Sequence, residues 1–264
     1  MITFALQTGS NGNAYYVETS DVRLLVDCGL TAKKAGARLA VYGVAPESID
    51  AILVTHDHRD HLRGVGVLTR RYGMPVYMTR GASRLSARRG VGRIDGTLRE
   101  FDAGATLRFG STTVESICTP HDGADSVVYL IEDADGSRLG VFTDLGHPFA
   151  GLRERITTCD AVYLESNHDL EMLRLGPYPE ALKARIRGPH GHLSNEESAL
   201  LVHDAITGPE RRLGLVVHCH LSQHNNTPRV ADETHRRVLG NGVRLGLAGR
   251  DGVSERYEVT TRSG

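Results

Sequence analysis

The chain has 264 residues, of which 40% are hydrophobic and 24% charged, and such values indicate a globular protein with a sizeable core. Its formal net charge of −1 at pH 7 argues against a protein that coats nucleic acid through charge alone. It contains no apolar stretch of about 18 residues, which a membrane span requires, and its first residues lack the basic and long apolar segments of a secretory signal.

Short apolar runs alternate with helical stretches in the first part of the chain. The earliest runs are rich in β-branched and aromatic residues, as strands are, and the first helix is expected to end at Gly43. Residues 51–56 form a continuous apolar run, which is typical of a strand covered on both faces. The expected strands span residues 13–19, 22–29, 51–56 and 75–79, and the expected helices span 31–43 and 61–73.

The later part begins with a series of strands separated by Gly and Asp turns and then returns to alternation. Helices outside sheets, with a β-meander in each half, favour an α/β helix–sheet–sheet–helix sandwich in one domain over residues 1–264. Periodicity alone does not distinguish this sandwich from a doubly wound sheet. The expected strands span 106–110, 112–120, 126–133, 137–144, 160–166, 213–220, 243–249 and 254–260, and the expected helices span 194–206 and 228–240.

The cysteines are scattered, and no two of them form a C-x-x-C pair. A zinc ribbon or a dithiol site is therefore not indicated. Buried free thiols suit a reducing compartment, so a cytoplasmic location is expected. The four cysteines are Cys28, Cys118, Cys159 and Cys219.

Potential metal ligands follow four apolar strands directly. Loops just past strand ends can converge at one sheet edge. His56 and His58 are two residues apart, so their rings point the same way in extended chain, and one segment can serve two neighbouring ions. Imidazole and carboxylate without sulfur suit zinc, manganese, iron or nickel. The candidates are His56, His58, Asp60 and His61 after residues 51–55, His121 after 114–120, Asp144 after 139–143, and His220 after 213–219.

The string THDHRDH over residues 55–61 resembles the H-x-H-x-D-H motif of the metallo-β-lactamase fold superfamily. The strings LLVDCG, TPHDGADSVVYL and GVFTDLG follow the order of landmarks in that superfamily, so the resemblance covers nearly the whole chain. More narrowly, TGSNGNAYYVE, residues 165–188 and GHLSNEESA are similar to the YycJ/WalJ-like branch. That branch comprises cytoplasmic bacterial hydrolases linked to DNA phosphodiester cleavage.

The resemblance implies a four-layer αββα sandwich of two mixed β-sheets flanked by helices, with two divalent metal ions per chain. Zinc or manganese is expected, with iron or nickel as alternatives. The string TPHDG departs from the commoner Gly-His pattern, so Asp122 competes with His121 at this position. The implied ligands are His56, His58 and His121 for one ion, Asp60, His61 and His220 for the other, and Asp144 for both.

Two ions ~3.5–4 Å apart can share a hydroxide that attacks a phosphodiester, so the expected activity is that of a DNA exonuclease. His192 resembles the histidine that phosphodiesterase members place beside the metals, which makes it the expected general acid. Glu165 is expected either to orient His192 or a ligand, or to be purely structural. Asp60 completes the expected catalytic set, and His168 is a candidate for contacting the substrate.

Two further segments are candidates for substrate binding. The loop GSNGN offers Ser10, Asn11 and Asn13 as donors to a phosphate, although an ordinary hairpin loop has the same composition. Eight arginines and no acid lie between residues 63 and 93, and Arg84 and Arg88 are predicted to contact a DNA backbone. The alternative for these arginines is a pair of solvated helices.

The spans between the expected ligands exclude large insertions. The short span from His121 to Asp144 leaves no room for the long arm of some tRNA-processing relatives, and no β-CASP cap is expected before His220. The expected partner is nucleic acid, with DNA favoured over RNA, and no membrane; the sequence does not indicate an oligomeric state. The alternatives are a hydrolase of small esters, lactones, thioesters or cyclic phosphodiesters, and a metal-binding regulatory protein without turnover.

Overall fold

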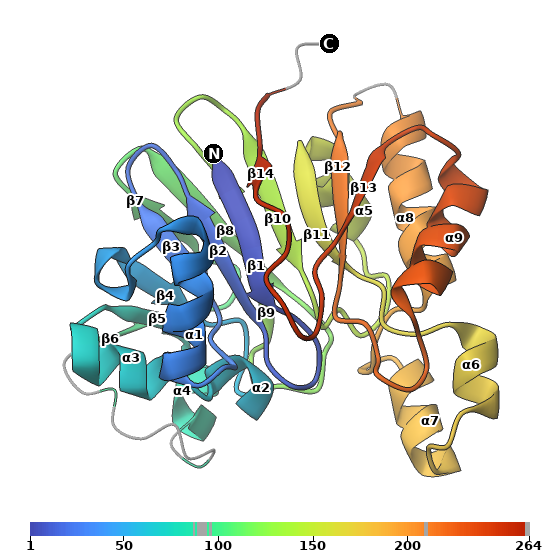
Figure 1. Ribbon diagram of the computed structural model, residues 1–264, viewed down its shortest axis with the longest axis horizontal. Helices are drawn as coiled ribbons and strands as arrows, with labels where there is room; N and C mark the ends of the chain where they lie inside the picture. Colours follow the sequence, from blue (N-terminus) through green and yellow to red (C-terminus); the bar gives the residue numbers. More distant parts are fainter. Residues whose placement is uncertain (87, 89–93, 95–96, 209–210, 262–264) are drawn as a thin grey trace.

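Two seven-stranded mixed sheets face each other, and helices cover both outer faces (Figure 1). The computed structural model describes residues 1–86, 88, 94, 97–208 and 211–261. The four layers run helix, sheet, sheet, helix, which confirms the αββα sandwich and excludes the doubly wound sheet. Among the described residues, no helix combines the length and apolar character needed to cross a membrane.

In the first sheet, an antiparallel meander continues into parallel strands. Strands β14, β1, β2 and β3 pair antiparallel, and β3 to β6 pair parallel. The order across the sheet is β14 (Tyr257–Glu258), β1 (Ile2–Gln7), β2 (Ala14–Glu18), β3 (Arg23–Val26), β4 (Ala51–Leu53), β5 (Val76–Thr79) and β6 (Leu98–Phe101).

The second sheet is built in the same way. Strands β7 to β10 form an antiparallel meander, and β10 to β13 pair parallel. The order is β13 (Arg244–Leu247), β12 (Leu215–Cys219), β11 (Ala161–Glu165), β10 (Arg138–Phe142), β9 (Val127–Glu132), β8 (Thr112–Cys118) and β7 (Thr106–Phe109).

Each sheet has its own set of helices, and one pair of helices stands apart. Helices α1, α3 and α4 pack on the first sheet, and α5, α8 and α9 pack on the second. Helices α6 and α7 lie at the lower end of the molecule, below the second sheet (Figure 1). The helices are α1 (Ala32–Leu39), α2 (Arg59–Leu62), α3 (Val65–Tyr72), α4 (Arg80–Ser86), α5 (Leu152–Thr158), α6 (Leu170–Leu175), α7 (Glu180–Arg187), α8 (Asn195–Thr207) and α9 (Pro228–Leu239), with short 3₁₀ turns η1 (Ala40–Tyr42) and η2 (Pro46–Ser48).

The helix expected over residues 61–73 is in fact two helices, α2 and α3. The break lies at Gly64, which packs against the chain between β3 and α1. A Cβ at this position would lie 2.2 Å from the carbonyl oxygen of Leu30. Glycine therefore lets the turn after β4 approach the neighbouring loop closely.

Three buried tyrosines lie between the two sheets, and the hydroxyls of two of them join the sheets. Tyr15, Tyr129 and Tyr163 lie in the core between the sheets. The hydroxyl of Tyr129, on the second sheet, donates to the carbonyl oxygen of Val54 at the end of β4, at 2.6 Å. The hydroxyls of Tyr163 and Thr3 lie 3.2 Å apart. Because the buried hydroxyls of Tyr129 and Tyr163 each find a partner on the opposite sheet, the strand ends of the two sheets keep a fixed relation.

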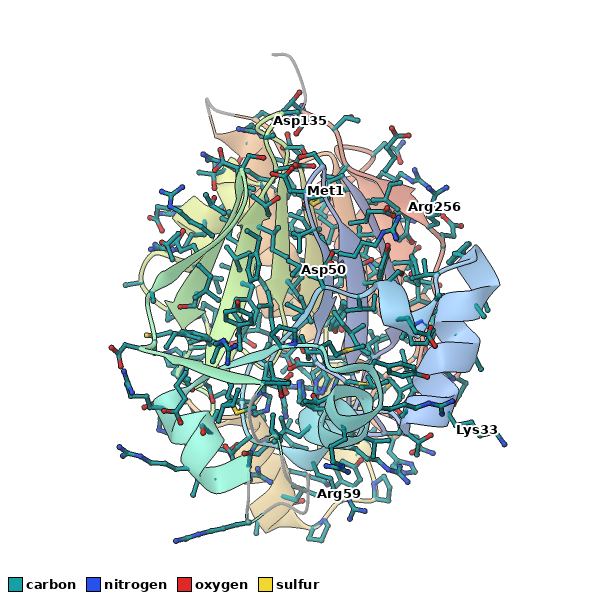
Figure 2. The ribbon with its side chains drawn as sticks, turned by 90° about the vertical axis from the view of Figure 1, so that its left-hand side faces the viewer. Met1, Lys33, Asp50, Arg59, Asp135 and Arg256 are labelled. Atoms are coloured by element: carbon teal, nitrogen blue, oxygen red, sulfur yellow. The ribbon has the colours of Figure 1, made fainter. Side chains whose placement is uncertain are left out.

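The carboxyl ends of the site-bearing strands lie at one end of the molecule. Figure 2 shows Arg59, in the turn after β4, at the opposite end from Asp135, in the turn between β9 and β10. Strand β10 starts near Asp135 and so runs toward the end where Arg59 lies. Strands β11 and β12 are parallel to β10, so residues that follow all three strands gather near the turn after β4.

Candidate metal centre

Three residues that follow strands adopt a left-handed backbone conformation. Asp27, Asp144 and His220 have φ values of 59°, 57° and 55°. Only a few per cent of non-glycine residues have positive φ, and such strain is found mainly at functional sites, where the surroundings hold the backbone in place. The bends turn these side chains out of the strand direction and toward a common point.

Acidic and imidazole side chains from distant segments meet at that point. Their ligand atoms form groups in which every atom lies within 4.8 Å of the others. All seven metal ligands predicted from the sequence lie in this cluster, and two of the groups match the two sets of three implied by the resemblance. The groups are His56, His58 and His121; Asp60, His61 and His220; His56, His61 and Asp144; and Asp144, Glu165, His192 and His220.

Asp144 lies between the two sets of three. Its Oδ2 is 3.3 Å from Nε2 of His61. Its Oδ1 is 3.5 Å from Nε2 of His220 and 3.7 Å from Nε2 of His121. One carboxylate thus faces a histidine of the first set and two of the second, which is the position that a bridging ligand requires.

The hydrogen-bond partners of the imidazoles fit a divalent cation. Nε2 of His56, His121 and His220 is buried and has no hydrogen-bond partner among the described residues. The Nδ1 atoms of the same rings lie 2.9 Å from Thr55 Oγ1, 3.1 Å from the Gly191 carbonyl oxygen and 3.2 Å from Glu165 Oε1. An unpaired buried nitrogen costs about 1–3 kcal/mol. An ion offsets that cost, because rings held through Nδ1–H present the Nε2 lone pair as a ligand.

Asp27 supports the same cluster from behind. Its Oδ2 is 2.8 Å from Nδ1 of His61, and it also accepts from the backbone nitrogen and Oγ1 of Thr55. Burial alone would lower the pKa of His61, but the carboxylates of Asp27, Asp144 and Asp60 outweigh burial and hold that pKa well above its usual value. The string LLVDCG contains Asp27, but nothing in the sequence indicated this role.

Glu165, at the end of β11, joins two of the histidines. Its fully buried carboxylate places Oε1 2.7 Å from Nδ1 of His192 and 3.2 Å from Nδ1 of His220. Its Oε2 accepts from the backbone nitrogens of Leu145 and Leu193. Burial by itself would raise the pKa of Glu165. His192 and His220 outweigh burial and lower this pKa to about 2. The group is therefore ionised at neutral pH and orients both rings.

A cavity of about 270 Å³ opens above the cluster. His58, Asp144 and His192 contribute to its floor, and the His192 side chain is 21% exposed there. One wall comes from residues 178–190 and includes Tyr178 and Arg185, neither of which the sequence predicted as a site residue.

Comparison with known proteins gives the family. The family model described as the metallo-beta-lactamase superfamily matches residues 8–136. Exodeoxyribonuclease WalJ of Streptococcus pneumoniae is 37% identical over 231 residues, which cover 87% of this chain and 84% of that protein. Exodeoxyribonuclease YycJ of Bacillus anthracis is 36% identical over 235 residues, which cover 89% of this chain and 87% of that protein. This chain belongs to the WalJ/YycJ family of the metallo-β-lactamase superfamily.

A solved structure agrees with the fold of this WalJ/YycJ family member. The metallo-beta-lactamase fold protein YhfI of Bacillus subtilis superposes with a TM-score of 0.73 at 16% identity, covering 97% of this chain and 99% of that one. At this identity the likeness shows the fold alone.

The loop GSNGN is only partly as predicted in this WalJ/YycJ-like chain. Ser10 is exposed and lines the cavity. Asn11 is exposed and donates to the Arg250 carbonyl oxygen, outside the cavity lining. Asn13 is fully buried, with Nδ2 3.0 Å from Nε2 of His61, so the structure does not place it at the cavity surface where the sequence predicts a substrate contact. Asn13 ties the loop to the metal motif instead.

The sequence predicts that His168 contacts the substrate. Its side chain is buried and is not among the residues that line the cavity. Burial lowers its pKa to about 4, which keeps the ring neutral. Its backbone forms a bridge to Ser194, the residue that caps α8, so the segment holds the loop that carries His192.

The arginine-rich stretch does not line the cavity in this WalJ/YycJ-like chain. Arg84 and Arg88 are exposed, but neither contributes to the cavity wall. Arg80 pairs with Asp102 and Glu100, which neutralises part of the positive charge. Arg89 and Arg93 lie outside the described residues. Counting charges along the sequence did not reveal which way α4 faces.

Proposed function

We propose that this chain is a dinuclear metal-dependent exodeoxyribonuclease that hydrolyses phosphodiester bonds of DNA. The main support is the pair of three-residue ligand groups on either side of Asp144, which lie beside the hydrogen-bonded His192 and Glu165. Relatives that align over most of the chain bear the name exodeoxyribonuclease, which supports DNA as the substrate class. Zinc or manganese is the proposed metal.

The proposed ligands follow the two groups. When bound, the two ions supply a water of lowered pKa and neutralise the phosphate oxygens as charge grows on them. His56, His58 and His121 would hold the first ion, and Asp60, His61 and His220 would hold the second, with Asp144 available to both.

His192 is the proposed proton donor. Glu165 accepts the Nδ1–H of His192 at 2.7 Å, which fixes the orientation of the ring. Nε2 is then left to give a proton to the oxygen that departs from phosphorus. Glu165 holds His220 through its Nδ1 as well, so one buried carboxylate sets the positions of the proton donor and of a metal ligand.

Two observations favour a second candidate, the hydrolysis of small esters or cyclic phosphodiesters. The net charge is near zero, and the cavity measures only about 270 Å³.

The chain's cysteines are free in the structure, which suits the cytoplasm for either activity. The described residues 144–208 fold into helices and one strand of the second sheet, which agrees with the proposal that no cap domain is inserted here.

A substrate panel separates the two candidates. Purified protein with Mn²⁺, Zn²⁺ or Co²⁺ is incubated with end-labelled single-stranded and duplex DNA, RNA, bis(p-nitrophenyl) phosphate, a lactone and a thioester. We expect release of mononucleotides from DNA, slower release from RNA, and no activity after chelation. Turnover of the lactone or thioester without any cleavage of DNA would overturn the proposed function.

Asp27 offers a test of the support behind the metal ligands. Asp27→Asn removes the negative charge that holds His61 and Thr55. We expect the affinity for Mn²⁺ to fall by about 10- to 100-fold, the usual cost of losing a residue that supports a ligand. Metal titration by calorimetry measures this affinity, and Asp21→Asn is the matched control, because Asp21 is exposed and accepts from Ser111 rather than from the cluster. An unchanged affinity in Asp27→Asn would contradict the supporting role.

A further inference from the structure

We propose that residues 178–186, which precede His192, bind the unpaired terminal nucleotide of a DNA strand. The ring of Tyr178 stacks on the base, and the guanidinium of Arg185 binds a phosphate. This proposal rests on the proposed function. The α7 wall is defined here as Tyr178, Leu182, Arg185 and Ile186, which all line the cavity.

The α7 wall is one face of a short helix. Leu182, Arg185 and Ile186 fall on one stripe of α7, and Tyr178 lies two residues before the helix begins. Figure 1 shows α7 at the lower end of the molecule, where the carboxyl ends of the site strands lie. A substrate bound at the metal cluster therefore meets this stripe, whose residues line the same cavity as the cluster.

The chemistry of the cavity matches the parts of a nucleotide. The α7 wall supplies an aromatic ring and two aliphatic side chains for a base. Ser10, Ser222 and Asn167 also line the cavity and offer polar groups for a sugar. The floor is the metal cluster, where the reacting phosphate lies under the proposed function. Base–aromatic stacking accepts every base, because each has a π-face.

Arg185 is fixed beside the metal cluster. Its Nε and Nη2 lie 2.9 and 2.5 Å from Oδ2 of Asp122. Oδ1 of Asp122 is 3.3 Å from Nε2 of His58 and 3.4 Å from Nε2 of His121. In the part of the chain that the structure describes, Nη1 of Arg185 has no partner. The side chain is 60% exposed, so a phosphate can reach a guanidinium that is already oriented.

The wall is held rigidly enough to act as a platform. Nζ of Lys183, a buried residue of α7, donates to the carbonyl oxygen of Arg174 in α6 at 2.9 Å. The backbone nitrogen of His192 donates to the carbonyl oxygen of Ile186 at 3.0 Å. The ring of Tyr178 contacts that of His224 edge to face, with centroids 5.6 Å apart. A preformed platform loses little entropy when a base stacks on it.

The size of the cavity selects an unpaired nucleotide. Small-molecule pockets start at ~300 Å³, and this cavity of about 270 Å³ is on the scale of a single nucleotide. We therefore expect a frayed or single-stranded end to enter more readily than a blunt duplex. The inferred ligand is therefore the free end of a single strand.

The absence of tryptophan from the chain provides a direct probe. Tyr178→Trp introduces a single indole into the α7 wall, and its fluorescence is followed during titration with a single-stranded oligonucleotide made uncleavable by terminal phosphorothioates. We expect the emission to be quenched, and the quenching to weaken when the terminal nucleotide is abasic. Tyr42→Trp, in η1 outside the cavity lining, is the matched control and should show no change.

Binding measurements on variants without the added tryptophan give the size of the change in Kd. Anisotropy with the same oligonucleotide should show a Kd about 5- to 100-fold higher for Tyr178→Ala, with Tyr178→Phe close to wild type because the stacking ring remains. Arg185→Ala should weaken binding and reduce the slope of log Kd against log salt by about one. Thermal melting confirms that each variant is folded.

The outcomes separate this proposal from the proposed function. If Tyr178→Ala and the abasic strand both bind as well as their references, the α7 wall is not a nucleotide site, whether or not the wild type cleaves DNA. If the stacking signals appear but DNA is not hydrolysed with any of the three metals, the wall stands as a nucleotide site and the proposed nuclease activity fails.

Discussion

His192→Gln is expected to lower kcat for DNA hydrolysis by about 10²- to 10⁴-fold, the usual contribution of a positioned proton donor. Glutamine keeps a polar side chain of similar size but cannot transfer a proton at neutral pH. The loss should be much smaller with bis(p-nitrophenyl) phosphate, because nitrophenolate departs without being protonated. His192 is proposed as a proton donor, so both ions should stay bound in this variant.

Steady-state kinetics on both substrates and metal analysis of the same preparations check this result. His203→Gln is the matched control, since His203 lies on α8 with its ring half exposed, outside the cavity lining. Equal losses on the two substrates would contradict the proton-donor role, and so would loss of a metal ion from His192→Gln.

His58→Ala and His220→Ala are expected to remove different ions. Each replacement leaves only two members of its three-residue group, together with Asp144. The affinity for the affected ion should fall by more than the ~10- to 100-fold that loss of a supporting residue costs. DNA hydrolysis should be abolished in both variants, because the reaction needs both ions in place.

Metal content after gel filtration separates the two sites. We expect about two Mn²⁺ per chain in the wild type, one in each single variant and none in Asp144→Asn at the same free metal concentration. Because bound metal stabilises the folded state by mass action, the metal-induced rise in Tm should shrink in the same order. Two ions retained in His58→Ala would contradict its assignment as a ligand.

The fold and the cluster could be predicted from the sequence because both depend on local patterns. Strand runs that end in ligands mark positions at one sheet edge wherever the strands are parallel, and β10, β11 and β12 are parallel. The H-x-H spacing places two rings on one side of an extended chain. Such features depend on residues close together in the sequence and not on how distant segments pack.

Features that depend on contacts between distant segments could not be predicted. Asn13 has the composition of a phosphate-binding loop residue, yet it is buried because it packs on His61, far along the chain. Gly64 breaks a helix because Leu30 lies beside it. The orientations of Arg84 and Arg185 depend on how α4 and α7 pack, and charge along the sequence carries no information about that.

Anomalous diffraction from crystals grown with Mn²⁺ tests the central claim most directly. Two peaks are expected, one among His56, His58 and His121 and the other among Asp60, His61 and His220, with the carboxylate of Asp144 between them. A single peak at saturating Mn²⁺, or two peaks remote from Asp144, would contradict the dinuclear centre and the chemistry proposed for it.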